Sequence, residues 1–230
     1  MKVVILAGGR GTRLSEYTKL IPKPMVKINN KPIIVYIIEH FYKHGIKDVI
    51  IAGGYKQKII KNYFIKKKLF KDINIRVVDT GLNSLTGKRI KKLKNLFSKN
   101  EIFFLTYGDG VSDINLEKLL KFHIRHKKIA TLTAVHPPAR FGELKLKNKN
   151  IVKFDEKPQL SKGWINGGFF VLNSKIFKYL NDKNVMFERE PVQKLIKKQN
   201  FMAYRHKSFW MCMDTSRDKI LLERILRKKN

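Results

Sequence analysis

Short apolar runs that alternate with helical patterns constrain the fold of this chain more than any other feature. The first run, residues 2–7, is apolar at every position after Lys2, which is typical of a strand covered on both faces. Four further runs follow at 47–52, 73–80, 102–108 and 129–135. Helical patterns lie between runs at 32–44, 56–68 and 115–127. Strands that alternate with helices predict a doubly wound, Rossmann-like α/β sheet.

The pattern changes after Pro137 and Pro138. Residues 142–158 alternate apolar and polar on both sides of Asn148, as the strands of an antiparallel hairpin do. Later elements are expected as a core strand at 164–173, a strand pair at 201–207 and 209–215, and a last helix at 217–228. We expect one domain, 1–230, with a mixed, mostly parallel sheet flanked by helices and a small antiparallel substrate-binding lid.

Length and composition exclude several classes of protein. At 230 residues with 43% hydrophobic residues, the chain can form a sizeable core and is too apolar for a disordered protein. No uncharged apolar stretch reaches the roughly 18 residues of a membrane span, and the N-terminus lacks a signal-peptide pattern. The single cysteine, Cys212, excludes an internal disulfide. We therefore expect a cytoplasmic protein with no membrane partner.

The net charge of +32 arises from 50 Lys and Arg residues against 18 Asp and Glu. Only 11 of the basic residues are Arg, and the lysines occur on almost every expected helix and hairpin. Dispersed charge of this kind favours a solvated surface over a dedicated nucleic-acid surface. We expect no specific nucleic-acid partner, whereas a polyanionic small substrate is compatible with the charge.

The first expected strand runs into a glycine-rich loop, AGGRGTRL, at residues 7–14. The loop lacks the dinucleotide fingerprint, because Leu14 replaces the third glycine and no acidic residue occurs between Glu16 and Glu39. It also lacks the Gly-Lys-[Ser/Thr] of a Walker loop. Backbone N–H groups near a turn, together with Arg13, remain suited to phosphate oxygens.

Three charged residues elsewhere can complete a phosphate site. Lys23 lies between Pro22 and Pro24, which restrict the backbone and hold its ammonium in place. Asp109 follows an expected core strand, at the end where α/β sheets bind ligands, and a carboxylate there suits Mg²⁺ beside phosphate. Asp214 is the candidate second carboxylate, although on its own it could equally cap the final helix.

The remaining titratable residues indicate no second site. The six histidines lack metal-ligand spacing, and His123 and His126, three apart on an expected helix, are expected on the surface. Cys212 is expected in the core, and Trp164 and Trp210 in aromatic packing.

The motifs, taken in order, resemble the sugar-1-phosphate nucleotidylyltransferase family. They are LAGGRGTRL, the PKP around Lys23, the GDG around Asp109, the EKP of 156–158, the NGG of 166–168, and Asp214. The resemblance covers nearly the whole chain and looks closest to the glucose-1-phosphate cytidylyltransferase subgroup. The segments that indicate this subgroup are 78–94, 105–113, 130–144 and 165–172.

The resemblance implies roles for individual residues. Nucleotide-binding residues would be Leu6, Ala7, Gly8, Gly9, Arg10, Gly11, Thr12, Arg13, Lys23, Ser84, Arg89 and Asp109. Ser84 stands where the subgroup usually carries Thr. Asp109 and Asp214 would hold Mg²⁺, and Arg13, Lys23 and Asp109 would be catalytic. The sugar phosphate would contact Lys157, Asn166 and Gly168, and Glu190 would bind sugar hydroxyls.

The reaction implied is transfer of a nucleotidyl group from an NTP to a sugar 1-phosphate, with release of pyrophosphate. The subgroup implies CTP and glucose 1-phosphate, giving CDP-glucose for nucleotide-sugar and polysaccharide biosynthesis. UTP, dTTP or GTP with a different sugar phosphate remain alternatives. A homo-oligomer is also expected.

Overall fold

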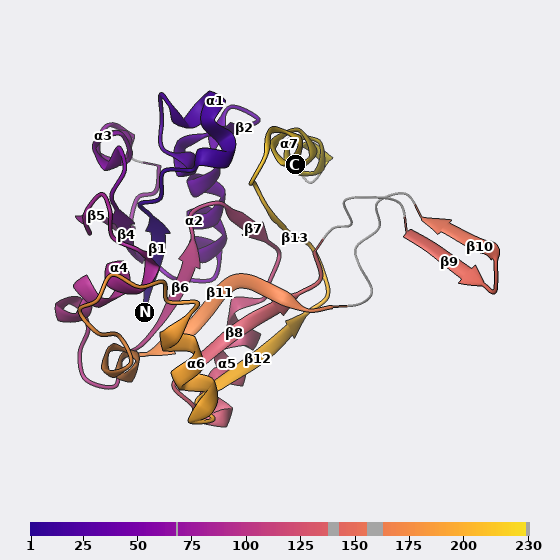
Figure 1. Cartoon of the computed structure of the whole chain (residues 1–230). Coiled ribbons are helices and arrows are strands. Elements are labelled where there is room, and N and C mark those ends of the chain that lie inside the picture. Colours follow the sequence, from indigo (N-terminus) through magenta and orange to yellow (C-terminus); the bar gives the residue numbers. More distant parts are fainter. Residues whose placement is uncertain (68, 138–142, 156–162, 229–230) are drawn as a thin grey trace.

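Seven strands form the central sheet of the computed structural model, which describes residues 1–67, 69–137, 143–155 and 163–228 (Figure 1). They lie in the order β12-β8-β11-β6-β1-β4-β5. Their bounds are β1 Lys2–Ala7, β4 Asp48–Gly53, β5 Asn74–Asp79, β6 Ile102–Tyr107, β8 Ala130–Val135, β11 Ile165–Asn173 and β12 Phe201–His206. Among these described strands only β11 runs antiparallel to its neighbours. The predicted mixed, mostly parallel sheet is confirmed.

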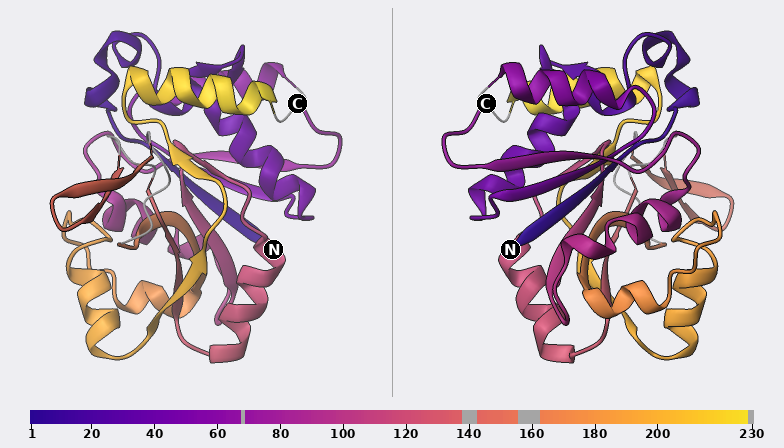
Figure 2. Two further views of the ribbon diagram at one scale, coloured as in Figure 1. Left: turned by 90° about the vertical axis from the view of Figure 1, so that its right-hand side faces the viewer. Right: turned by 90° about the vertical axis from the view of Figure 1, so that its left-hand side faces the viewer.

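Helices cover both faces of the sheet, because successive side chains of a strand point to opposite faces. In β1, Val3 and Ile5 join one buried cluster with α2, α5 and α7, whereas Val4 and Leu6 join a second cluster with α4 and α6. Figure 2 shows α5 and α6 on opposite sides of the strands. The helices are α1 Ser15–Thr18, α2 Ile33–Lys43, α3 Gln57–Lys66, α4 Thr86–Lys92, α5 Leu116–His126, α6 Glu190–Lys197 and α7 Ser216–Lys228. Short 3₁₀ helices are η1 Thr12–Leu14, η2 Lys23–Met25, η3 Lys94–Leu96 and η4 Ser174–Lys178.

The expected pairing of the last two strands with each other is wrong. β12 instead pairs in parallel with β8 at the edge of the sheet. The short strand β13, Trp210–Cys212, pairs antiparallel with β7, Gly110–Ser112. Each of these two strands thus pairs with a strand that comes earlier in the sequence. The apolar–polar alternation of the C-terminal segment predicts strands but not their partners. The β7–β13 pairing brings Asp214 next to Asp109, and Met213 N donates to Asp109 O at 2.9 Å.

The predicted hairpin is confirmed as β9, Glu143–Lys147, and β10, Asn150–Asp155. In Figure 1 it lies to the right of the sheet. Ile151 and Phe154 are both about 60% exposed on it. Its role as a substrate-binding lid stays a prediction. A further short pair, β2 Lys27–Ile28 and β3 Lys31–Pro32, precedes α2.

His123 is buried, so the prediction of a surface position was wrong for this residue. Its Nδ1 lies 2.8 Å from Thr131 Oγ1 on β8, and His126 Nε2 lies 2.7 Å from the same oxygen. Both rings therefore belong to the contact between α5 and the sheet. A polar pair can face inward here because one buried hydroxyl satisfies a nitrogen of each ring.

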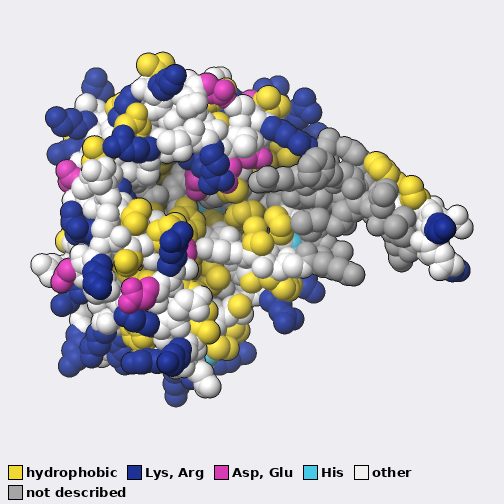
Figure 3. All heavy atoms as spheres, in the orientation of Figure 1, with side chains coloured by type: hydrophobic (Ala, Val, Ile, Leu, Met, Phe, Trp, Pro, Cys, Tyr) yellow, Lys and Arg dark blue, Asp and Glu magenta, His cyan; other side chains and the backbone are white. Residues whose placement is uncertain are grey.

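Charge is dispersed over the surface. On the face shown in Figure 3, Lys and Arg side chains are spread around the whole outline and are not gathered in one patch. This distribution agrees with the expected solvated surface. Among the described residues, no helix is both long and apolar enough to cross a membrane.

Candidate functional site

The glycine-rich loop leaves the carboxyl end of β1 and turns at Gly11. Gly11 has φ 65°, in the left-handed region that favours glycine. A Cβ at this position would lie 2.9 Å from Thr18 Cγ2 and 3.0 Å from Lys23 Cβ. The loop is therefore packed against η2, the 3₁₀ turn that carries Lys23. Because β1 and β6 are parallel neighbours, the loop also lies beside the end of β6, where Asp109 follows.

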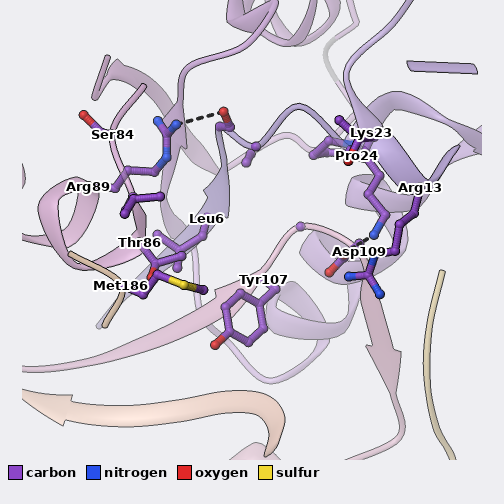
Figure 4. Close-up of a pocket in the computed structure, with 17 residues that line it drawn as sticks. Leu6, Arg13, Lys23, Pro24, Ser84, Thr86, Arg89, Tyr107, Asp109 and Met186 are labelled. Carbon is purple, nitrogen blue, oxygen red and sulfur yellow. Dashed lines mark hydrogen bonds and ion pairs between the residues drawn. The ribbon is translucent and has the colours of Figure 1, made fainter. Parts of the chain in front are cut away.

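A pocket of about 340 Å³ opens at this edge of the sheet (Figure 4). It is lined by Leu6, Ala7, Gly8, Gly9, Gly11, Thr12, Arg13, Lys23, Pro24, Ser84, Leu85, Thr86, Arg89, Tyr107, Gly108, Asp109 and Met186. The structure thus brings together every residue predicted to bind nucleotide except Arg10. Arg10 is exposed and donates from Nη2 to Asn83 Oδ1 at 3.4 Å. The volume suits a ligand of nucleotide size.

Charged groups gather at one end of the pocket. Lys23 Nζ donates to Asp109 Oδ2 at 2.5 Å and to Asp214 Oδ1 at 2.7 Å. Arg13 Nη1 donates to Asp214 Oδ2 at 2.8 Å. The side chain of Lys23 is only 12% exposed, whereas that of Arg13 is 69% exposed. Two cations and two carboxylates from three distant parts of the sequence therefore meet at one point.

The charges of this cluster stabilise one another. Burial alone lowers the pKa of Lys23, but Asp109 and Asp214 outweigh it, so the pKa lies above its ordinary value. Burial raises the pKa of Asp214, but the bond from Lys23 and the charges of Lys23 and Arg13 bring it below its ordinary value. Lys23 is therefore protonated and Asp214 ionised at neutral pH.

The two carboxylates also fit a divalent cation. Asp109 and Asp214 converge on a single ammonium, so their oxygens already point at one shared position. Mg²⁺ is usually held by one or two carboxylates together with substrate phosphates. Among the described residues, no group of three His, Cys, Asp or Glu side chains could hold a metal ion alone. A metal at this position would need further oxygens from its substrate.

Arg89 lies at the opposite end of the pocket and is 3% exposed. Its guanidinium donates to Gly8 O at 2.8 Å, Gly53 O at 2.8 Å and Gly81 O at 2.9 Å. It also donates to Thr80 Oγ1 at 2.6 Å. Burial lowers its pKa below the ordinary value. Arg89 therefore joins the ends of β1, β4 and β5 behind this side of the pocket.

The residues predicted to bind the sugar phosphate are not all brought together. Asn166 Nδ2 donates to Tyr107 Oη at 3.2 Å, and Gly168 has φ 77°, with its ideal Cβ position 2.5 Å from the Tyr107 ring. Both therefore lie beside the pocket. Glu190 is exposed at the start of α6 and pairs with Lys194 at 2.6 Å. Lys157 lies outside the described residues.

Sequence reasoning missed several residues at this pocket, among them Thr86, Tyr107, Met186 and Glu188. Thr86, Tyr107 and Met186 line it, and Glu188 bonds to the first two. Thr86 and Tyr107 lie in segments 78–94 and 105–113, which indicated the subgroup, so their place in these segments could have identified them as site residues. Glu188 had no such signal, because it lies two residues before the equally polar Glu190.

Comparisons with known proteins agree with this geometry. The sequence model described as nucleotidyl transferase matches residues 2–218. The chain is 42% identical to glucose-1-phosphate cytidylyltransferase of Salmonella typhimurium, over 99% of this chain and 96% of that protein. It is 39% identical to D-glycero-alpha-D-manno-heptose 1-phosphate guanylyltransferase of Campylobacter jejuni, over 77% of this chain and 78% of that protein. The structure of HddC from Yersinia pseudotuberculosis complexed with GMP-PN matches with a TM-score of 0.75 and 26% identity, over 98% of this chain and 99% of that one.

Proposed function

This chain belongs to the nucleotidyl transferase family, and on that premise we propose that it transfers a cytidylyl group from CTP to glucose 1-phosphate. The products are CDP-glucose and pyrophosphate. The observation that carries the proposal is the cluster of Arg13, Lys23, Asp109 and Asp214 at one end of a nucleotide-sized pocket. The family match over 2–218 supports a single nucleotidyltransferase domain.

The distribution of charge along the pocket orients the nucleotide. In Figure 4, Ser84, Thr86 and Arg89 lie at one end, and Arg13, Lys23 and Asp109 lie at the other. The guanidinium of Arg89 is bonded to backbone carbonyls of the pocket wall, whereas the cations of the second end, Arg13 and Lys23, are paired with side-chain carboxylates that a triphosphate can replace. We place the nucleoside against the first end and the triphosphate beside Arg13 and Lys23.

The chemistry needs alignment and charge neutralisation. A phosphate oxygen of the sugar phosphate attacks the α-phosphorus of CTP, and pyrophosphate leaves on the opposite side. This nucleophile is already anionic, so no general base is required. Lys23 and Arg13 offset the charge on the triphosphate, and Arg13 faces the leaving pyrophosphate.

Asp109 and Asp214 would hold Mg²⁺, because both carboxylates converge on one position. When bound there, Mg²⁺ would neutralise the negative charge on the phosphate oxygens. Lys23 has to leave the space between the carboxylates, and the triphosphate offers its ammonium new partners. The protein's own residues thus exchange one set of charge pairs for another when substrate arrives.

The sugar phosphate is proposed to contact Asn166, Gly168 and Lys157, with Glu190 on the sugar hydroxyls. Asn166 and Gly168 support this placement because they lie beside Tyr107 at the pocket. The exposed position of Glu190 requires that the sugar extend toward α6 or that α6 move. Lys157→Ala is expected to raise the KM of glucose 1-phosphate; an effect on CTP alone would contradict its assignment.

GTP is the second candidate nucleotide. The Campylobacter relative, at 39% identity, is named as a guanylyltransferase, so members of similar distance use another base. UTP and dTTP are the other alternative nucleotides. The pocket wall around Ser84 and Thr86 is where such a difference is expected to be encoded.

Asp109→Asn tests the proposed site directly. The exchange keeps the shape of the side chain and removes a charge that Lys23 and the metal both use. Turnover with Mg²⁺ and saturating substrates is expected to fall by about 100-fold or more. Asp182→Asn, at an exposed residue that does not line the pocket, is the matched control and should retain wild-type turnover. Wild-type turnover of Asp109→Asn would remove this carboxylate from the mechanism.

A further inference from the structure

The carboxylate of Glu188 bridges two residues that line the pocket. Glu188 Oε1 accepts from Tyr107 Oη at 2.5 Å, and Oε2 accepts from Thr86 Oγ1 at 2.6 Å. Glu188 itself is half-buried behind them. Hydrogen bonds to an ionised acceptor are the stronger class. One side chain therefore fixes the positions of two hydroxyl groups that come from different elements.

The segment that carries Glu188 is itself held against the nucleotide end of the pocket. Residues 184–187 lie along residues 85–87, at the start of α4. The bonds are Leu85 N to Asn184 Oδ1 (2.8 Å), Gly87 N to Val185 O (3.1 Å) and Phe187 N to Thr86 Oγ1 (2.8 Å). A Cβ on Gly87 would lie 2.7 Å from Val185 O, so the two segments are in close contact. The backbone that carries Glu188 is therefore held in place by these hydrogen bonds.

Tyr107 continues the same connection toward the sugar side. Its hydroxyl donates to Glu188 and accepts from Asn166 Nδ2 at 3.2 Å. Asn166 Oδ1 accepts from Gly168 N at 2.8 Å, so the amide of Asn166 has a defined orientation. Burial and the charge of Glu188 raise the pKa of Tyr107 above its ordinary value, which keeps its hydroxyl a donor.

We propose that Glu188 is a positioning residue for nucleotidyl transfer, which fixes Thr86 on the nucleotide side and Tyr107 with Asn166 on the sugar-phosphate side. The hydrogen-bonded chain Thr86–Glu188–Tyr107–Asn166 spans the two halves of the pocket. In-line transfer requires both substrates to be held in register, and small displacements reduce rates strongly. The inference rests on the proposed function, since it assigns one end of this hydrogen-bonded series to the nucleotide and the other end to the sugar phosphate.

Single variants separate the two arms of the carboxylate. Tyr107→Phe keeps the ring that packs against Gly168 and removes only the hydroxyl. It is expected to raise the KM of glucose 1-phosphate about 10-fold and leave the KM of CTP unchanged. Thr86→Val is expected to do the reverse. Glu188→Ala is expected to raise both KM values about 10-fold.

The conservative variant and a double variant distinguish positioning from general stability. Glu188→Gln can still accept from Tyr107 and donate to Thr86, so its KM values are expected within about 3-fold of wild type. The double variant Glu188→Ala, Tyr107→Phe should have the same KM for glucose 1-phosphate as Glu188→Ala alone. Each substitution already breaks the hydrogen bond between Tyr107 and Glu188, so the second adds no further loss. Glu117→Ala, an exposed glutamate on α5, is the matched control and should match wild type.

The assay uses the NTP and sugar 1-phosphate that the wild-type protein turns over best, so a different base preference does not affect the test. Wild-type KM values in Glu188→Ala, with wild-type turnover intact, would overturn the inference alone. The inference would also be overturned if Tyr107→Phe and Thr86→Val each changed both KM values equally. These two variants keep the test available if Glu188→Ala does not fold. A wild-type protein inactive with every substrate pair would overturn the proposed function and this inference together.

Discussion

Arg89 illustrates how one buried charge can organise a binding pocket. Its guanidinium has five bonds to groups at or after the ends of β1, β4 and β5, and no carboxylate accepts from it among the described residues. The guanidinium spreads five donors over three nitrogens in a fixed plane, whereas an ammonium has three donors on one nitrogen, so a lysine could not reach all of these separated acceptors. The pocket wall therefore depends on this side chain even without a ligand.

Arg89→Lys is expected to lower the free energy of unfolding by about 2–4 kcal/mol, because buried carbonyls lose their donors. Urea denaturation measures the change. The control is Arg76→Lys, since Arg76 forms a half-exposed pair with Asp48 at 3.4 Å and its exchange should cost less than about 1 kcal/mol. Equal stability of the Arg89 variant and wild type would contradict the role of Arg89 in the wall.

Lys23 occupies the position between Asp109 and Asp214 that the proposed metal requires. Lys23→Met removes this ammonium and leaves the two carboxylates without the cation that lies between them. Calorimetry on the nucleotide-free protein is expected to show Mg²⁺ binding at least about 10-fold tighter than in wild type. Turnover should nevertheless fall, because the triphosphate loses a cation. Unchanged or weaker Mg²⁺ binding would contradict the arrangement.

At the scale of elements, the contact between α5 and β8 depends on uncharged histidines. His123 and His126 share the hydroxyl of Thr131, which can donate to one ring and accept from the other. Burial lowers the pKa of His123 from 6.5 to about 4. Between these values the unfolded chain binds more protons than the folded one, so stability falls as the pH falls through this window.

The pH dependence can be assigned to His123 by substitution. The urea midpoint of the wild-type protein is expected to decrease from pH 7 to pH 5, and His123→Gln should show a flatter dependence over the same range. His40, whose pKa burial also lowers to about 4, titrates equally in both proteins and acts as an internal reference. Identical slopes for the two proteins would show that His123 does not contribute.

The apolar runs predicted the core strands and helices well, because burial on both faces of β1, β4 and β6 leaves a direct mark on the sequence. Partners of the late strands were not predictable in this way. β12 and β13 each pair with an edge formed by an earlier strand, and no local pattern encodes that choice. The site follows the same division: Arg13, Lys23, Asp109 and Asp214 lie together as their motifs suggested, whereas the contacts of Glu188 exist only in the folded chain.

For the whole molecule, the pocket lies where the loops after β1, β5 and β6 meet, and residues from the C-terminal third complete it. Five lysines (Lys91, Lys94, Lys99, Lys175 and Lys178) line one further groove, whereas the other basic side chains are dispersed over the face shown in Figure 3. So few contacts to phosphates would be weak and sensitive to salt. Duplex DNA is therefore expected to bind only weakly. In a salt titration, the complex should be lost at about 150 mM salt. A tight complex that persists at this salt concentration would indicate a specific nucleic-acid surface.

Pyrophosphate release tests the central claim most directly. The wild-type protein is assayed with Mg²⁺ and the four candidate nucleotides CTP, UTP, dTTP and GTP, each crossed with several hexose 1-phosphates. The account predicts strong release with CTP and glucose 1-phosphate and much weaker release with the other pairs. Strong release with another pair would keep the family and contradict the proposed substrates, and no release with any pair would contradict nucleotidyl transfer itself.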